Sequence, residues 1–191
     1  MKKVLFYILT AALLSSSSTV WAQSSAPIEY SERVPVDNTN KGSLYRRGLD
    51  WAQNHFAYTP TSEFKTDPST GSIRVIGTSK VKPVNAAGKD QISIVRFEFI
   101  FNCTSQGYTY SVGSFRYVPD PKKNPNQTIS LDEYLSELAA DKNIDKSHND
   151  RRVAAQANAL ASEIAMNFRS FMNTIPTIED GSVGLPANSG E

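Results

Sequence analysis

The side chains that most often perform catalysis or bind metals are few in this chain of 191 residues. Its two histidines are His55 and His148, and its single cysteine is Cys103. They do not recur at the spacing of a zinc or haem site, and no nucleophile elbow, phosphate-binding loop or dinucleotide-binding motif is present. The sequence therefore predicts no catalytic residues, no metal site and no cofactor, and we expect that the protein is not an enzyme.

The densest group of acidic residues is Asp132, Glu133 and Glu137. Ser130 precedes it with the spacing of a capping box, in which the serine caps a helix and Glu133 lies in the first turn. Carboxylates in a first turn usually interact with the helix dipole, and this role is favoured over a calcium site or a catalytic carboxylate pair. The cluster therefore indicates the start of a helix.

Residues 91–118 have the pattern of two β-strands joined by a tight turn at residues 104–107. Apolar residues alternate with polar ones along the first strand, at Val95, Phe97, Phe99 and Phe101. Cys103 continues this alternation, which predicts a buried and inert thiol. Gly107 ends the turn and is free to adopt a positive φ.

The alternation of this hairpin changes phase at two points, between Ile94 and Val95 and again around Gly113. After the second point Phe115 and Tyr117 replace the earlier apolar positions. An extra residue in one strand of a pair changes the phase in this way, so both points predict β-bulges.

The periodicity of the remaining chain predicts the other elements. Strands are expected over residues 30–36, 63–66 and 72–84, and helices over residues 43–56, 130–141 and 150–173. The apolar stripe of the longest helix is Val153, Ala157, Leu160, Ile164, Phe168, Phe171 and Ile175. Gly48 in the first helix predicts a close approach to the sheet. This order predicts an α+β fold, with an antiparallel sheet of about five strands and helices packed on one face.

If the apolar positions of the central strands face the helices, the opposite sheet face carries a mixed set of side chains. This set is Arg74, Ile76, Lys80, Lys82, Arg96 and Glu98, together with Ile100. A solvated face with ordinary charges is the more common meaning of such a pattern. The alternative is a binding surface, in which isoleucines among basic groups take an anionic ligand, an unknown envelope protein or a second copy of the chain.

The two ends of the chain differ in composition from the middle. Residues 1–22 resemble a signal peptide, with Lys2 and Lys3 before an apolar run and cleavage expected before Gln23. No lipoprotein cysteine is near that point and no membrane span is expected, so we predict a periplasmic or secreted protein. Residues 28–175 are expected to form a single domain, followed by a disordered tail over residues 176–191.

The charge of the chain argues against nucleic acid as a partner. Removing Lys2 and Lys3 from the 20 basic residues leaves 18, against 19 acidic residues. Proteins that bind DNA or RNA usually carry a clear basic excess. Any attraction for an anionic partner must therefore be local.

The sequence between Glu32 and Val118 resembles a bacterial envelope domain of unknown function with a fold like that of the TATA-binding protein (TBP). The resemblance rests on Val34-Pro35, Leu44-Tyr45 with Trp51, the strand at residues 71–77, and the hairpin ending in Gly107-Tyr108-Thr109-Tyr110. The chain differs in having Ala52 where an aromatic residue often follows the tryptophan, and in its additional helix at residues 130–141. The resemblance implies a strand-helix-four strands-helix unit and no activity, and fold alone does not imply DNA binding.

Two hypotheses for function follow. The first is a non-catalytic binding or interaction module of the cell envelope that acts through the open sheet face. The alternative is a small-ligand carrier or enzyme with a pocket between the long C-terminal helix and the sheet. The absence of a catalytic motif favours the first.

Overall fold

The computed structural model describes residues 27–37, 40–141 and 148–174, so the predicted signal peptide and C-terminal tail lie outside the described residues. The strands are β1 (Tyr30–Pro35), β2 (Glu63–Asp67), β3 (Ser72–Val81), β4 (Ser93–Thr104), β5 (Gly107–Val118) and β6 (Ile129–Ser130). The helices are α2 (Lys41–Asp50), the π-helical segment η1 (Trp51–His55), α3 (Leu131–Ala140) and α4 (Asn149–Asn173).

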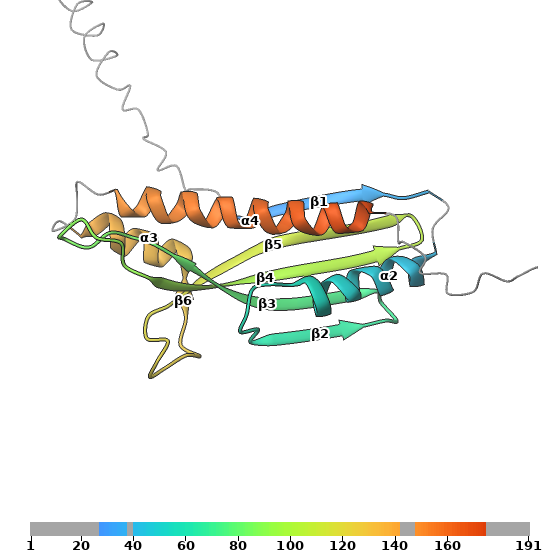
Figure 1. The fold of residues 1–191 in the computed structure, drawn as a ribbon, viewed down its shortest axis with the longest axis horizontal. Coiled ribbons are helices and arrows are strands. Elements are labelled where there is room, and N and C mark those ends of the chain that lie inside the picture. The colour runs from blue at the N-terminus through green and yellow to red at the C-terminus, as the bar shows by residue number, and fades with distance from the viewer. Residues whose placement is uncertain (1–26, 38–39, 142–147, 175–191) are drawn as a thin grey trace, which may run out of the picture.

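The strands form one antiparallel sheet in the order β1-β5-β4-β3-β2. β6 pairs with the end of β5, on residues 116–117, while β1 pairs with residues 107–112 of the same strand. Figure 1 shows α4 running along β1 and β5, and α2 lying in front of the central strands. The predicted α+β fold is confirmed, and the two-residue strand β6 is an addition to the five expected.

One of the two predicted β-bulges is present. The pairing of β4 with β5 shifts between Arg96 and Glu98, where β5 contains one extra residue and Ser114 has a φ of 51°. The bulge predicted beside Ile94 is wrong, because the alternation of β4 continues through Ser93. Ser93 is buried although it is polar, since its hydroxyl lies 3.1 Å from the hydroxyl of Tyr134.

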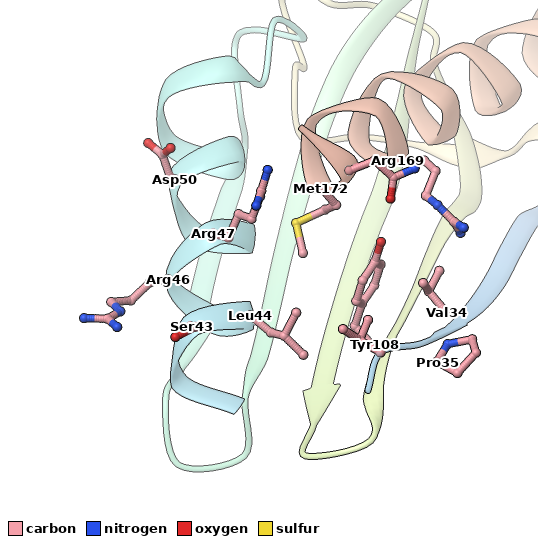
Figure 2. Close-up of a pocket in the computed structure, with 12 residues that line it drawn as sticks. Val34, Pro35, Ser43, Leu44, Arg46, Arg47, Asp50, Tyr108, Arg169 and Met172 are labelled. Carbon is pink, nitrogen blue, oxygen red and sulfur yellow. The ribbon is translucent and has the colours of Figure 1, made fainter. Parts of the chain in front are cut away.

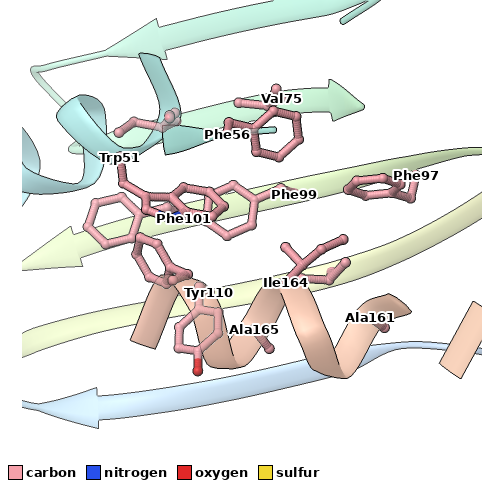
Figure 3. Close-up of a cluster of buried hydrophobic side chains, with 14 of the residues drawn as sticks. Trp51, Phe56, Val75, Phe97, Phe99, Phe101, Tyr110, Ala161, Ile164 and Ala165 are labelled. Atoms are coloured by element: carbon pink, nitrogen blue, oxygen red, sulfur yellow. The ribbon is translucent and has the colours of Figure 1, made fainter. Parts of the chain in front are cut away.

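The core between sheet and helices is built around aromatic rings. The ring of Trp51 lies 4.7 Å from that of Phe99 and 4.9 Å from that of Phe168, measured between centroids. The indole N–H of Trp51 donates a 2.9 Å hydrogen bond to Asn167, so its one polar group is satisfied. Figure 3 shows Trp51 and Phe99 together with Phe101 and Tyr110 in the layer between the sheet and α4. The two helices and three central strands therefore share one core.

The face that α4 buries is rotated from the predicted stripe. Its buried apolar positions are Val153, Ala157, Ala161, Ile164, Ala165, Phe168 and Met172. Leu160 and Phe171 are only partly buried at the flanks. Short alanine side chains let the helix approach the sheet closely, so the alanine-rich side becomes the contact and the larger side chains move outward. Ile175 lies outside the described residues.

Gly48 brings α2 close to the sheet, as predicted. A Cβ atom added at Gly48 would lie 2.8 Å from the ring of Phe101. α2 begins at Lys41 and not at the predicted Ser43, because the side chain of Asn40 caps it by accepting a 2.7 Å hydrogen bond from the backbone N–H of Gly42. The helix is thus fixed both at its start and along its inner face.

The structure confirms the positive φ of Gly107 and the predicted burial of Cys103. Gly107 has a φ of 132°, and a Cβ atom there would lie 2.1 Å from the carbonyl oxygen of Val34. Cys103 is 1% exposed, and burial raises the pKa of its thiol. A neutral, buried thiol is a poor nucleophile, so Cys103 acts as a core residue.

Candidate functional site

The first candidate site is a cleft of about 360 Å³ on the sheet face opposite the helices, named here the open-face cleft. Four of the six predicted binding residues line it, namely Arg74, Ile76, Arg96 and Glu98. The other lining residues are Ser62, Phe97, Ser114, Arg116, Asn126 and Thr128. Strand alternation brings the side chains of β3 and β4 to one face, and the loop between β5 and β6 adds the last two.

Arg74 is the arginine of this cleft whose charge is neutralised by ion pairs within the protein. Its Nε donates to Glu98, and its Nη1 donates to Glu63 over 2.8 Å. The hydrogen bond to Glu98 is the main reason that the pKa of Arg74 is raised, and a hydrogen bond from Lys65 is the main reason that the pKa of Glu63 is lowered. Two carboxylates therefore already neutralise the charge that a ligand would otherwise meet at Arg74.

Arg96 and Arg116 differ from Arg74 because they form no ion pair within the described residues. They are paired directly opposite each other across β4 and β5, which puts both side chains on the open face. The Nε of Arg96 is buried without a hydrogen-bond partner among these residues, and Arg116 has a single 3.5 Å contact with the hydroxyl of Thr128. Two adjacent guanidinium groups are thus available to an anion.

The two predicted lysines lie apart from the cleft. Lys80 is exposed on β3 opposite Ile94, nearer the end of the strand. Lys82 lies beyond β3 and is not part of the sheet face, which corrects its predicted position. The side chain of Gln156 accepts from the backbone N–H of Lys82 over 2.8 Å, and Arg152 donates to its carbonyl over 2.7 Å. α4 therefore ends β3 at Val81, three residues before the predicted end.

Sequence reasoning missed Arg116, Ser114, Asn126 and Thr128. The sequence did contain the information needed to place Arg116. The phase change at Gly113 puts Phe115 in the core, and the next residue, Arg116, must then lie on the open face. Asn126 and Thr128 lie in a proline-rich loop without periodicity, so no pattern in the sequence indicates where they point.

The second candidate site is a cleft of about 730 Å³ between α2, the C-terminal end of α4 and the adjoining ends of β1 and β5, named here the helix cleft. Its apolar lining residues are Val34, Pro35, Val36, Leu44 and Met172, with Tyr108. Its polar lining residues are Ser43, Arg46, Arg47, Asp50, Arg169 and Asn173. Figure 2 shows Arg47 and Met172 reaching into the space between the helices, whereas Arg46 points away from it.

Arg47 and Arg169 face the helix cleft from different helices and are held in different ways. Nη2 of Arg47 donates to the carbonyl oxygen of Phe171 over 2.8 Å and to the hydroxyl of Thr174 over 3.2 Å. Arg169 forms an ion pair with Glu32. A hydrogen bond from Tyr110 is the main reason that the pKa of Glu32 is lowered, and Arg169 lowers it further. Arg169 is therefore compensated, while Arg47 keeps an unneutralised charge within the described residues.

Tyr108 forms part of the floor of the helix cleft and is 4% exposed. Its hydroxyl has no hydrogen-bond partner among the residues that the structure describes. Burial raises the pKa of this hydroxyl, so it is a neutral donor. An unsatisfied buried hydroxyl costs about 1–3 kcal/mol, and such groups in folded proteins call for an explanation.

The described part of the chain contains no group of three or more His, Cys, Asp or Glu side chains placed to hold a metal ion. Among the same residues, no helix is both long and apolar enough to cross a membrane. What the two clefts offer is guanidinium, hydroxyl and amide groups, which bind anions and polar ligands.

The fold and these clefts describe an α+β protein with a helix-covered antiparallel sheet and arginine-lined cavities on both sides. Residues 30–118 match the model of a family described as a domain of unknown function (DUF4468) with a TBP-like fold. The match agrees with the expected extent of the resemblance, residues 32–118.

Two solved structures are similar to the chain. A DUF4468 family protein from Bacteroides ovatus has a TM-score of 0.50 and 12% sequence identity, over 79% of this chain and 89% of that one. A TBP-like protein from Parabacteroides distasonis has a TM-score of 0.49 and 18% identity, over 78% of this chain and 95% of that one. No curated protein matches the sequence. At such identities the likeness to the first structure shows the fold alone.

Proposed function

We propose that the protein is a non-catalytic binding module of the bacterial cell envelope, periplasmic or secreted, that holds an anionic ligand in the open-face cleft. The observation that carries this proposal is the position of Arg96 directly opposite Arg116. Like charges placed opposite each other in an antiparallel pair weaken a sheet, so folding gives no reason for the pair. Binding gives one, because a guanidinium group holds a carboxylate or phosphate through two parallel hydrogen bonds.

The rest of the cleft favours a small and polar ligand. Hydroxyl and amide groups from Ser62, Ser114, Asn126 and Thr128 surround the two arginines, and Ile76 supplies a limited apolar surface. The volume of about 360 Å³ lies within the range of roughly 300–1,000 Å³ that is usual for small-molecule sites. The ligand class is therefore a compact molecule with a carboxylate or phosphate next to further hydrogen-bonding groups.

A dimer through the open face is the less favourable arrangement. Two copies related by a two-fold axis over the cleft would bring Arg96 and Arg116 of both copies together, and like charges brought together at an interface repel each other. The export part of the proposal rests on the sequence of residues 1–22, with its basic start, apolar run and expected cleavage before Gln23.

The proposal is tested by titrating the purified protein with inorganic phosphate and with citrate while backbone NMR shifts are recorded. Changes are expected around Arg96, Ser114 and Arg116, and the affinity should fall with added salt because exposed charges are screened over about 8–10 Å. Arg96→Gln should weaken binding by about tenfold, the equivalent of one charge-assisted hydrogen bond.

Lys122→Gln is the matched control, because Lys122 is an exposed cation in the loop after β5 that does not line the cleft. It removes the same charge and should leave both affinities unchanged. The proposal is wrong if neither anion shifts the cleft resonances, or if Lys122→Gln weakens binding as much as Arg96→Gln does.

A further inference from the structure

We infer that the helix cleft is a second binding site, and that it takes a small amphipathic anion consisting of one carboxylate on an apolar body. The cleft lies on the helix-covered side of the sheet, at the C-terminal end of α4, whereas the open-face cleft lies on the opposite side. Its volume of about 730 Å³ lies in the upper part of the range of roughly 300–1,000 Å³ for ligand pockets.

The apolar part of such a ligand has a continuous surface to contact. Val34 and Leu44 are both 6% exposed and Met172 is 8% exposed, so together they form a firm wall and floor that are already packed into the core. Pro35 and Val36 extend this surface along the end of β1. When the apolar part of a ligand displaces water from this surface, binding is stabilised by about 25 cal/mol for each Å² of apolar area buried.

The anionic part of the ligand is drawn to Arg47. Only Nη2 of this residue is used in protein hydrogen bonds, so its remaining guanidinium N–H groups are open to a ligand within the described part of the chain. Phe171 fixes the side chain twice, through its carbonyl oxygen and through its ring, whose centroid lies 5.7 Å from Cζ of Arg47. A cation held in place before binding loses little entropy when an anion arrives.

The other charges at the cleft leave this attraction in place. Arg169 is paired with Glu32. Asp50, the one acidic residue in the lining, accepts a 2.7 Å hydrogen bond from Asn54, and Figure 2 shows it pointing away from the space between the helices. Tyr108 lies on the floor of the cleft, and its hydroxyl has no partner among the described residues; Figure 2 shows its ring pointing up between Met172 and Arg169. Small movements of these two long side chains bring a bound carboxylate within reach of that hydroxyl.

The test measures calorimetric binding of octanoate, 1-octanol and acetate to the purified protein. Octanoate carries both parts of the proposed ligand, octanol only the apolar part and acetate only the charge. Octanoate is expected to bind at least about tenfold more tightly than either, which corresponds to one charge-assisted contact added to the apolar one. Equal affinity for octanoate and octanol, or no binding of octanoate, would overturn the inference.

Two substitutions separate this site from the open-face cleft. Arg47→Met keeps the apolar stem and should reduce octanoate binding to the level of octanol, while phosphate binding stays unchanged. Arg116→Met should reduce phosphate binding and leave octanoate binding unchanged. Tyr108→Phe is the second variant for the helix cleft. Its hydroxyl has no partner within the described part of the chain, so removing it should not weaken folding, and the affinity for octanoate alone should fall. If Arg116→Met reduces octanoate binding as much as Arg47→Met does, the helix cleft is not the site.

Discussion

The open-face cleft and the helix cleft both contain arginines, but the chain positions them by different means. In the first, strand register sets Arg96 opposite Arg116, and neither is ion-paired within the described residues. In the second, Arg47 is held by hydrogen bonds to the end of α4. Each cleft also contains one arginine that is neutralised, by Glu98 in one case and by Glu32 in the other. An arginine in a cleft is therefore a candidate for binding an anion only if no carboxylate of the protein already pairs with it.

The largest expected effect comes from breaking the core that supports both clefts. Phe168 is fully buried, and its ring contacts those of Trp51, Phe101, Tyr108 and Tyr110. Phe168→Ala should lower the free energy of unfolding by about 3–5 kcal/mol, measured by urea denaturation. Because Tyr108 loses this support, octanoate binding should weaken more than phosphate binding.

Met166→Ala is the matched control for this substitution. Met166 lies two residues earlier on the same helix and is 64% exposed, so the change should alter stability by no more than about 0.5 kcal/mol. Similar losses for the two variants would mean that α4 is not packed as described.

A smaller effect, on phosphate affinity, is expected from removing the negative charge that neutralises Arg74. Glu98→Gln keeps a hydrogen-bond acceptor beside Arg74 but removes a negative charge from the open-face cleft. A unit charge at about 8 Å is worth roughly 0.5 kcal/mol in water and about 2 kcal/mol at an effective dielectric constant of 20. Phosphate affinity should therefore rise by about two- to thirtyfold in a calorimetric titration.

Glu133→Gln serves as the control for Glu98→Gln, since Glu133 is an exposed carboxylate on α3 outside both clefts. It should leave phosphate affinity within the experimental error. If Glu98→Gln leaves the phosphate affinity unchanged, the ion pair with Glu98 is not what makes Arg74 a poorer anion-binding group than Arg96.

Alternation in the sequence was enough to predict the open face and four of the residues in its cleft. It predicted Arg74, Ile76, Arg96 and Glu98 because each is two residues from a neighbour of the same orientation within one strand. It was wrong for Lys82, whose backbone is bound by Gln156 and Arg152 from a helix more than 60 residues away. No local pattern carries information about such a contact.

The helix cleft shows the same limit more strongly. Its lining comes from the end of β1, the start of α2, the start of β5 and the end of α4, which are far apart in the sequence. Helical periodicity predicted a long helix over the sheet, and a pocket between them was one of two hypotheses. The rotation of α4 toward its alanines decides where that pocket lies, and this rotation depends on packing rather than on the apolar stripe.

The central claim is that Arg96 and Arg116 are placed together for binding and at some expense to folding. Arg116→Gln tests it most directly, with urea denaturation and phosphate titration performed on the same sample. Removing one of two opposed like charges should leave the free energy of unfolding unchanged or raise it by up to about 1 kcal/mol, while phosphate binding falls by about tenfold. A variant that is less stable than the wild type and still binds phosphate with full affinity would contradict the claim.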